Sequence, residues 1–491
     1  MAPITDTLWY LINLAPMPVG VVTAFFAFYI GSFVYSLFFS PLAQIPGPLI
    51  CRWTPLWTYY HSYVGDECTR IDDLHKRYGP VVRIAPNEVV IADGAALAPI
   101  YNEKGGFKKA DCYANFDIEG HATIFSTRDA EYRSKRSKAV LPMFSMNNIR
   151  SEQQVIEDCV SRFIRRTKLE RDEAKKDGNV VNMLNLTRSL ALDAATSYLF
   201  GLPYGGIDEK SERLSASGYV DVLVAVGRFF FMPNWLFLAL EMTRSRLFPS
   251  KEEAESDKKV VNFAREAMHT NEKDSSTYQG RLAKAGISEH EIEVQMKDLM
   301  FAGTDSTGTN LSTLCWWLAK KPEVYKTLRK EISEAPADAN PQSLRYLDAV
   351  VREGLRVSMA NPTRLPRIVP LGGWTFQASN GRSYFIPEDT LVGCQLYTLH
   401  FNPAVFVDPF AFKPERWLDA TPEMQRDAIA FGLGQRQCIA RNLAQTELLL
   451  AVRAIAREGL LEGATAVGEK IEMFEWFNSK IKGERIDLRW S

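Results

Sequence analysis

The chain has 491 residues, of which 46% are hydrophobic and 11% aromatic, so it carries enough apolar side chains for a large core. Its 58 basic and 59 acidic residues leave a net charge of −1, which excludes the basic footprint of a nucleic-acid-binding protein. The 7 cysteines are scattered without a CxxC pair, which argues against a zinc ribbon, an iron–sulfur cluster or a dense disulfide framework.

The N-terminal segment is strongly apolar, with no charged residue between Asp6 and Arg52. As a helix, residues 19–39 would span about 31 Å, enough for the hydrocarbon core of a bilayer. A cleavable signal peptide would have a basic start and a shorter apolar run, and a buried helix would show a polar stripe. We therefore predict a single-pass membrane anchor and linker over residues 1–45, followed by one body over 46–491. The charge bias of Asp6 before the span and Arg52 after it favours a cytosolic body.

The body is predicted to be mainly α with a smaller β portion. The Pro-Gly-Pro sequence at 46–48 blocks helix continuation and predicts a stiff connection. A helical pattern covers 68–78, and two alternating runs around a Pro-Asn turn predict a β-hairpin over 81–92. Residues 129–320 are mostly helical in pattern, and short strands separated by Pro and Gly return after residue 360. No internal repeat or low-complexity tract divides the body.

The longest predicted helix begins at Ser288, in the capping-box sequence Ser-Glu-His-Glu, and ends at Lys320 before a proline. Its middle, residues 302–309, has the sequence AGTDSTGT. Each glycine inside a helix costs about 1 kcal/mol, so something should offset these residues. Either a neighbouring helix packs closely against them, or the hydroxyl groups distort the helix to hold water or a ligand.

Three further signals follow in order. Glu353 and Arg356 have i,i+3 spacing on a second predicted helix, where such a pair usually faces solvent. Arg416 lies in a Pro-bounded irregular segment and could meet Glu353. Cys438 follows a glycine-bearing loop, and an apolar helical run, 439–457, begins right after it. Loop N–H groups and a helix N-terminus favour a thiolate, although a buried structural cysteine is the alternative.

Taken together, these four motifs resemble the cytochrome P-450 superfamily of haem-thiolate monooxygenases. They are the helix with Asp305-Ser306, then Glu353-x-x-Arg356, then Pro414-Glu415-Arg416-Trp417, then Phe431-x-x-Gly434-x-Arg436-x-Cys438. Each motif alone is a weak signal, but their order, behind an apolar N-terminus and Pro-Gly-Pro, is specific. The resemblance implies a cytochrome P-450 fold with an N-terminal transmembrane anchor, of fungal microsomal type, and a haem-thiolate catalytic domain over residues 46–491.

The resemblance also implies the haem ligands. Cys438 would bind the iron of haem b (heme b) as thiolate, while Phe431 and Gly434 belong to the same loop. Arg436 would pair a haem propionate, because a guanidinium matches a carboxylate in bidentate geometry. Arg136 and Arg367 resemble further propionate partners. Tyr132 stands where the family usually has Trp or His, and its hydroxyl can still donate a hydrogen bond.

On the opposite face of the haem, Asp305 and Ser306 match the acid–alcohol pair that delivers protons to bound dioxygen. Ser306 stands where Thr is commoner and lacks the methyl group that restricts the rotamer. Ala440 stands where Gly is usual, so one methyl group must fit beside the porphyrin. Glu353, Arg356 and Arg416 would form a buried structural network behind the cysteine loop.

Electrons would come from a membrane-bound NADPH–cytochrome P-450 reductase with FAD and FMN, because the chain after Cys438 is too short for a flavin domain. An apolar organic substrate is expected, with contacts from residues 106–126, the Phe229 region, 360–366 and 474–477. Asn361 and Thr363 are its possible polar anchors.

The reaction expected is a monooxygenation in fungal specialised metabolism, at the endoplasmic reticulum membrane. Xenobiotic or fatty-acid hydroxylation is the alternative within the same chemistry. A haem-thiolate isomerase or dehydratase, a haem sensor and a thiol hydrolase are the alternatives from other classes.

Overall fold

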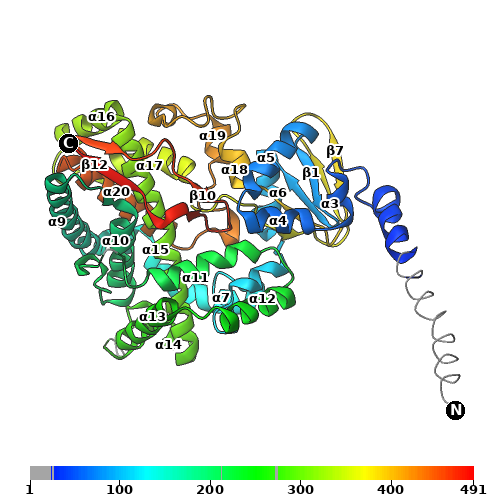
Figure 1. Ribbon diagram of the computed structural model, residues 1–491, viewed down its shortest axis with the longest axis horizontal. Helices are drawn as coiled ribbons and strands as arrows, with labels where there is room; N and C mark the ends of the chain where they lie inside the picture. The colour runs from blue at the N-terminus through cyan, green and yellow to red at the C-terminus, as the bar shows by residue number, and fades with distance from the viewer. Residues whose placement is uncertain (1–23, 25–26, 212, 271–274) are drawn as a thin grey trace, which may run out of the picture.

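The computed structural model of the protein describes residues 24, 27–211, 213–270 and 275–491, and it is mainly helical. Its α-helices are α3 (Leu49–Trp53), α4 (Leu56–Val64), α5 (Glu67–Tyr78), α6 (Leu97–Tyr101), α7 (Ala130–Val140), α8 (Met146–Ser151), α9 (Gln153–Asp177), α10 (Met183–Phe200), α11 (Ser217–Val226), α12 (Asn234–Leu247), α13 (Lys251–Thr270), α14 (Tyr278–Lys284), α15 (Glu289–Lys320), α16 (Pro322–Glu334), α17 (Arg345–Ser358), α18 (Leu396–His400), α19 (Pro422–Asp427) and α20 (Arg441–Arg457). The longer helices gather at the end of the molecule that carries the C-terminus, while α3–α6 lie at the opposite end (Figure 1).

The strands form one main sheet and three small ones. They are β1 (Val81–Ala85), β2 (Glu88–Ile91), β3 (Lys108–Lys109), β4 (Val181–Asn182), β5 (Arg367–Ile368), β6 (Trp374–Gln377), β7 (Ser383–Ile386), β8 (Leu391–Gly393), β9 (Ala464–Ala466), β10 (Met473–Phe474), β11 (Lys480–Ile481) and β12 (Asp487–Trp490). The main sheet has the order β1-β2-β8-β5-β3, and β2 and β8 are its parallel pair. The predicted β1–β2 hairpin is confirmed, with Val81 opposite Ile91. The small sheets are β4-β12-β9, β6-β7 and β10-β11.

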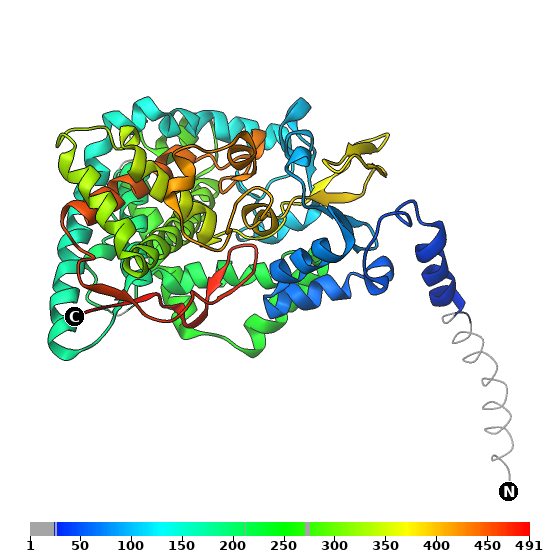
Figure 2. The same cartoon turned by 90° about the horizontal axis from the view of Figure 1, so that it is seen from above.

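The long helix α15 runs through the helical part of the molecule and packs along α10 (Figure 2). Its bounds match the prediction, and Gly308 explains part of its unusual composition. A methyl group on Gly308 would lie 2.7 Å from Cγ of Arg188 on α10, so glycine permits this close approach. Thr187 donates a hydrogen bond to the Gly308 carbonyl, at 2.8 Å. Close helix packing therefore offsets the cost of this glycine.

The predicted capping box at the start of α15 is not formed. Ser288 has the extended backbone of an N-cap residue, but its side chain makes no capping hydrogen bond. Glu291, the other half of the box, accepts hydrogen bonds from Tyr132 and Arg136 instead. A distant guanidinium has thus replaced the local backbone partner.

The predicted anchor over residues 19–39 lies partly on residues 1–23 and 25–26, which are outside the described residues. Along the part of the chain that the structure does describe, no helix combines the length and the apolar character required to cross a bilayer. The Pro-Gly-Pro sequence that follows lies against β1. There the Pro46 carbonyl accepts the Arg83 N–H at 2.8 Å, and a methyl group on Gly47 would lie 2.2 Å from the Arg83 carbonyl.

Candidate active site

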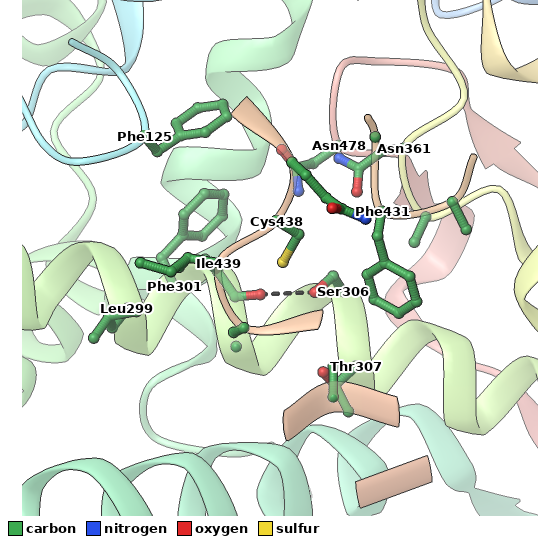
Figure 3. Close-up of a pocket in the computed structure, with 18 of the residues that line it drawn as sticks. Phe125, Leu299, Phe301, Ser306, Thr307, Asn361, Phe431, Cys438, Ile439 and Asn478 are labelled. Carbon is green, nitrogen blue, oxygen red and sulfur yellow. Dashed lines mark hydrogen bonds between the residues drawn. The ribbon is translucent and has the colours of Figure 1, made fainter. Parts of the chain in front are cut away.

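A cavity inside the helical part separates α15 from the Cys438 loop (Figure 3). Cys438 opens onto this cavity, although the surrounding protein shields the sulfur from bulk water. Ser306 on α15 lines the opposite wall, and Phe431 lies to one side of the sulfur. The structure therefore brings the cysteine and the hydroxyl residue of two distant motifs to one cavity.

The Cys438 loop has a geometry that depends on glycine. Gly434 has φ +71°, and a methyl group there would lie 1.9 Å from the Tyr101 carbonyl oxygen. The Cys438 N–H donates to the Phe431 carbonyl at 2.9 Å, which closes the loop. Burial raises the pKa of the Cys438 thiol, while the N–H of Ala440 opposes this by favouring the thiolate.

The helix after Cys438 begins at Arg441, slightly later than the predicted start of the helical run. Ala440 is the N-cap residue of this helix and lines the cavity. Its methyl group, which the usual glycine would lack, therefore lies at the cavity wall.

Four cationic side chains from separate elements line the same cavity: Lys109, Arg133, Arg367 and Arg436. The pairing of β3 with β5 places Lys109 directly opposite Arg367. Burial, together with Arg133 and Arg367, lowers the pKa of Arg436 to about 10, and its Nη1 is buried without a hydrogen-bond partner among the described residues. Burial and three neighbouring guanidinium groups lower the pKa of Lys109 far below its ordinary value.

These features fit a haem. A cluster of like charges is unfavourable unless an anion accompanies it, and an orphaned guanidinium nitrogen is costly. The two haem propionates supply that anion, and a thiolate supplies the axial ligand. Sequence analysis missed Lys109 and Arg133. Both residues lie in short basic stretches of the sequence, which could have indicated an anion-binding site. Such stretches are equally typical of a solvent-exposed surface.

Two of the predicted propionate partners point elsewhere. Arg136 forms an ion pair with Glu291 and stacks over the Tyr132 ring, with 3.2 Å from Cζ to the ring centroid. The Tyr132 hydroxyl donates to the same Glu291 carboxylate at 2.6 Å. Neither residue lines the cavity, whereas Arg133, on the same helix α7, does. A role for Arg136 and Tyr132 at a propionate stays a prediction.

The acid–alcohol pair is divided between two faces of α15. Ser306 faces the cavity, and its hydroxyl donates to the Ala302 carbonyl at 2.8 Å (Figure 3). Asp305 faces α10 and accepts a hydrogen bond from Arg188 at 2.5 Å. Burial raises the pKa of the Asp305 carboxyl, and Arg188 opposes this shift.

The predicted structural network forms around Glu353, which is buried. Arg356 makes a bidentate pair with it, at 2.8 and 2.9 Å, and Arg416 adds a contact at 3.1 Å. The Trp417 indole N–H donates to the second oxygen at 2.9 Å. An i,i+3 pair of opposite charges usually faces solvent, but Glu353 and Arg356 are both buried.

His400 connects this network to the cysteine loop, and sequence analysis missed it. Its carbonyl accepts from Arg356 at 2.9 Å, and its Nε2 accepts the Ile429 N–H at 3.1 Å, two residues before Phe431. Burial and Arg356 lower the pKa of His400 to about 4, which suits a neutral ring that accepts a hydrogen bond. A lone histidine in a sequence carries no sign of such a link.

The substrate side of the cavity is apolar, with a few amides. Tyr113, Phe125, Leu365 and Phe477 line it, from three of the four predicted segments. Asn361 also lines it, and its amide donates to the Phe477 carbonyl at 3.1 Å. The other predicted polar anchor, Thr363, is buried outside the cavity lining. The Phe229 region also lies outside that lining, with Phe230 buried and Trp235 exposed.

The fold and this cavity define a haem-thiolate oxygenase, and comparison with known proteins agrees. The sequence model of the family described as Cytochrome P450 matches residues 46–458, so the chain belongs to the cytochrome P450 family. It is a haem-dependent monooxygenase, in which a cysteine ligates the haem iron and one atom of molecular oxygen is incorporated into the substrate. The expected family, enzyme class and cofactor are confirmed.

Similar proteins come from fungi. The chain is 38% identical to "Cytochrome P450 monooxygenase mfmF" of Annulohypoxylon moriforme over 93% of this chain and 97% of that protein. It is 29% identical to "Cytochrome P450 monooxygenase tazI" of Aspergillus terreus, over 85% and 86% of the two chains. A crystal structure of a cytochrome P450, CYP102L1, matches with a TM-score of 0.67 at 17% identity, over 86% of this chain and 97% of that one.

Proposed function

We propose that Cys438 is the axial ligand and that Arg436 and Arg367, with Lys109 and Arg133, hold the haem propionates. The observation that carries this assignment is the cysteine sulfur facing Ser306 across a cavity lined by four basic side chains, of which Arg436 has a buried Nη1 without a hydrogen-bond partner among the described residues (Figure 3). Bound haem supplies the iron at which dioxygen is activated. The protein supplies a dry loop around the sulfur, in which Phe431 excludes water and Gly434 permits the tight turn.

On the opposite wall, Ser306 would hold a proton at its Oγ, which the Ala302 carbonyl already orients. Asp305 would act behind it, on the α10 side of the helix, as the carboxyl that passes protons from the interior, while its ion pair with Arg188 fixes its orientation. A haem-thiolate isomerase or dehydratase needs no such proton supply, which makes it the weaker candidate.

The substrate proposed is an apolar organic molecule oxidised in fungal specialised metabolism, with xenobiotic or fatty-acid hydroxylation as the second candidate. The aromatic lining of the cavity supports an apolar substrate. Electrons would come from an NADPH–cytochrome P450 reductase with FAD and FMN. The apolar N-terminal sequence supports residence at the endoplasmic reticulum membrane, where a shared anchor would raise the effective concentration of the two proteins.

The test is the carbon-monoxide difference spectrum of the reduced, haem-replete protein. We expect the Soret band of a thiolate-ligated haem, and its loss in Cys438→Ala. A well-folded, haem-replete protein without that band would contradict the assignment of Cys438. NADPH consumption that depends on both reductase and substrate then separates a monooxygenase from an isomerase.

The same assay examines Ser306. Ser306→Ala should raise the share of NADPH electrons released as hydrogen peroxide, and Ser306→Thr, which keeps the hydroxyl, should not. Equal coupling in all three proteins would remove Ser306 from the proton path.

A further inference from the structure

The cavity wall formed by α15 carries an acidic residue that neither the haem nor the proton path uses. Residues 298, 302 and 306 are spaced by four, so they lie along one face of the helix. All three line the cavity, with Asp298 two turns from Ser306. At 1.5 Å per residue, the eight steps from residue 298 to residue 306 correspond to about 12 Å along the helix axis.

Asp298 is 9% exposed, and no ion pair to it forms among the residues that the structure describes. Its neighbour on the other face of the helix differs in this respect. The Lys297 ammonium is paired with Glu119 at 2.7 Å and with Asp257 at 3.1 Å. Burial raises the pKa of Asp298 to about 6, and the Thr123 hydroxyl opposes this shift. Near neutral pH the carboxylate is therefore charged, buried and without a counter-ion, which is costly.

The cations of the cavity do not resolve this cost. Lys109 is the basic group that influences Asp298 most, but its ammonium binds the Phe125 carbonyl and lies 4.0 Å from the Tyr113 ring centroid. Lys109 is also one of the side chains proposed to hold a haem propionate, so that anion competes for its charge. Arg133, Arg367 and Arg436 are the proposed partners of two propionates. Glu447, the other carboxyl in the described lining, lies on α20 after the cysteine loop.

We propose that Asp298 selects substrates that carry a cationic nitrogen, a protonated or quaternary amine, on an otherwise apolar skeleton. The carboxylate is the counter-ion that the cation meets, and the aromatic and aliphatic lining receives the remainder. The spacing along α15 orients the molecule so that the oxidised carbon lies beside Ser306, about 12 Å from the nitrogen. This inference rests on the proposed function, since it places the oxidised end at the haem.

The experiment compares two probes of equal shape, octyltrimethylammonium and its neutral carbon isostere, 2,2-dimethyldecane. A quaternary nitrogen cannot ligate the iron, so both probes report through the same low-spin to high-spin shift of the Soret band. The holoenzyme is titrated with each probe, as wild type and as Asp298→Asn. We expect Asp298→Asn to weaken the cation about tenfold or more, and to change the neutral probe by less than about twofold.

Two variants accompany this test. Asp298→Glu keeps the charge and should restore much of the affinity for the cation. Asp257→Asn removes a carboxylate beside Lys297, outside the cavity, and should leave both probes unchanged.

The proposal is overturned if Asp298→Asn weakens both probes equally, which would be a structural effect, or if the cation fails to bind the wild type. These outcomes are read only in protein that shows the thiolate Soret band with carbon monoxide. Loss of that band in wild type would instead be a failure of the proposed function.

Discussion

Arg188 on α10 and Asp305 on α15 form a buried ion pair at 2.5 Å, and the same guanidinium reaches Asp221 on α11 at 3.3 Å. One arginine therefore joins three helices behind the cavity wall. Consecutive residues of a helix are turned by about 100°, which is why Asp305 meets Arg188 while Ser306 faces the cavity. In the proposed relay, a proton that passes between Asp305 and Ser306 would have to go around the helix, so the ion pair with Arg188 should influence whether the carboxyl takes part.

Asp305→Asn should therefore affect both stability and catalysis. It leaves Arg188 with a single carboxylate in the interior, and breaking a buried pair costs roughly 3–5 kcal/mol, less whatever Asp221 recovers. The free energy of unfolding in urea measures this cost. The share of NADPH electrons released as hydrogen peroxide should rise in the same variant.

Asp221→Asn is the matched control, because it removes the other carboxylate of Arg188 and leaves Asp305 in place. We expect it to lower stability with little change in coupling. If both variants release peroxide to the same extent, Asp305 acts only as a structural partner of Arg188.

Two glycines of the cysteine loop allow a sharper comparison. Gly434→Ala should cost roughly 2–5 kcal/mol and prevent haem retention, because a methyl group would strike the Tyr101 carbonyl and the residue has positive φ. Gly432→Ala has a similar φ of +69°, but nothing lies closer than 3.9 Å to its added methyl group. It should cost about 1 kcal/mol and keep the haem. The measurement is the haem content of each variant after purification. Equal haem losses in the two variants would contradict the steric explanation.

The features predicted well from the sequence are local ones. The bounds of α15 follow from its apolar pattern, a start signal at Ser288 and a proline after Lys320. The β1–β2 hairpin follows from alternation around a turn. The haem-ligand role of Cys438 was predicted from the order of four motifs, because the loop alone equally suits a buried structural cysteine.

The features that escaped prediction depend on partners far away in the chain. Arg136 turns from the cavity because Glu291, 155 residues later, binds it. Asp305 turns to Arg188 on a helix that shows no matching pattern in the sequence. His400 acquires its role only where the loop before Phe431 folds against it. Side-chain direction is set by tertiary contacts, and a single sequence does not record them.

The Glu353 network should be essential for holding the cysteine loop. Glu353→Gln keeps the shape but leaves Arg356 and Arg416 without their carboxylate, at a cost of roughly 3–5 kcal/mol, and we expect poor haem retention. Asp348→Asn on the same helix provides the comparison. That carboxylate is 44% exposed and lies 3.9 Å from Arg352, so its loss should cost no more than about 0.5 kcal/mol. The unfolding temperature and the haem content should both be clearly lower in Glu353→Gln than in Asp348→Asn. Similar values would show that the buried Glu353 network does not hold the cysteine loop.

Glu447 gives a pH dependence whose sign follows from its burial. The side chain lines the cavity from α20, and burial alone raises its pKa from 4.5 to about 8. The folded protein therefore keeps a proton that the unfolded chain releases above pH 4.5. The stability contributed by this group is complete below that pH and is lost as the pH rises to about 8, by up to about 1.4 kcal/mol per pH unit.

Glutamine does not titrate, so Glu447→Gln should gain stability relative to wild type between pH 6 and pH 8, measured by urea denaturation of the holoenzyme. The control is Glu458→Gln, just after the end of the same helix. Glu458 is 45% exposed and pairs with Lys168 at 2.7 Å, so its loss should change the free energy of unfolding by no more than about 1 kcal/mol. A difference between wild type and Glu447→Gln that does not change with pH would mean that the carboxyl reaches solvent through the cavity.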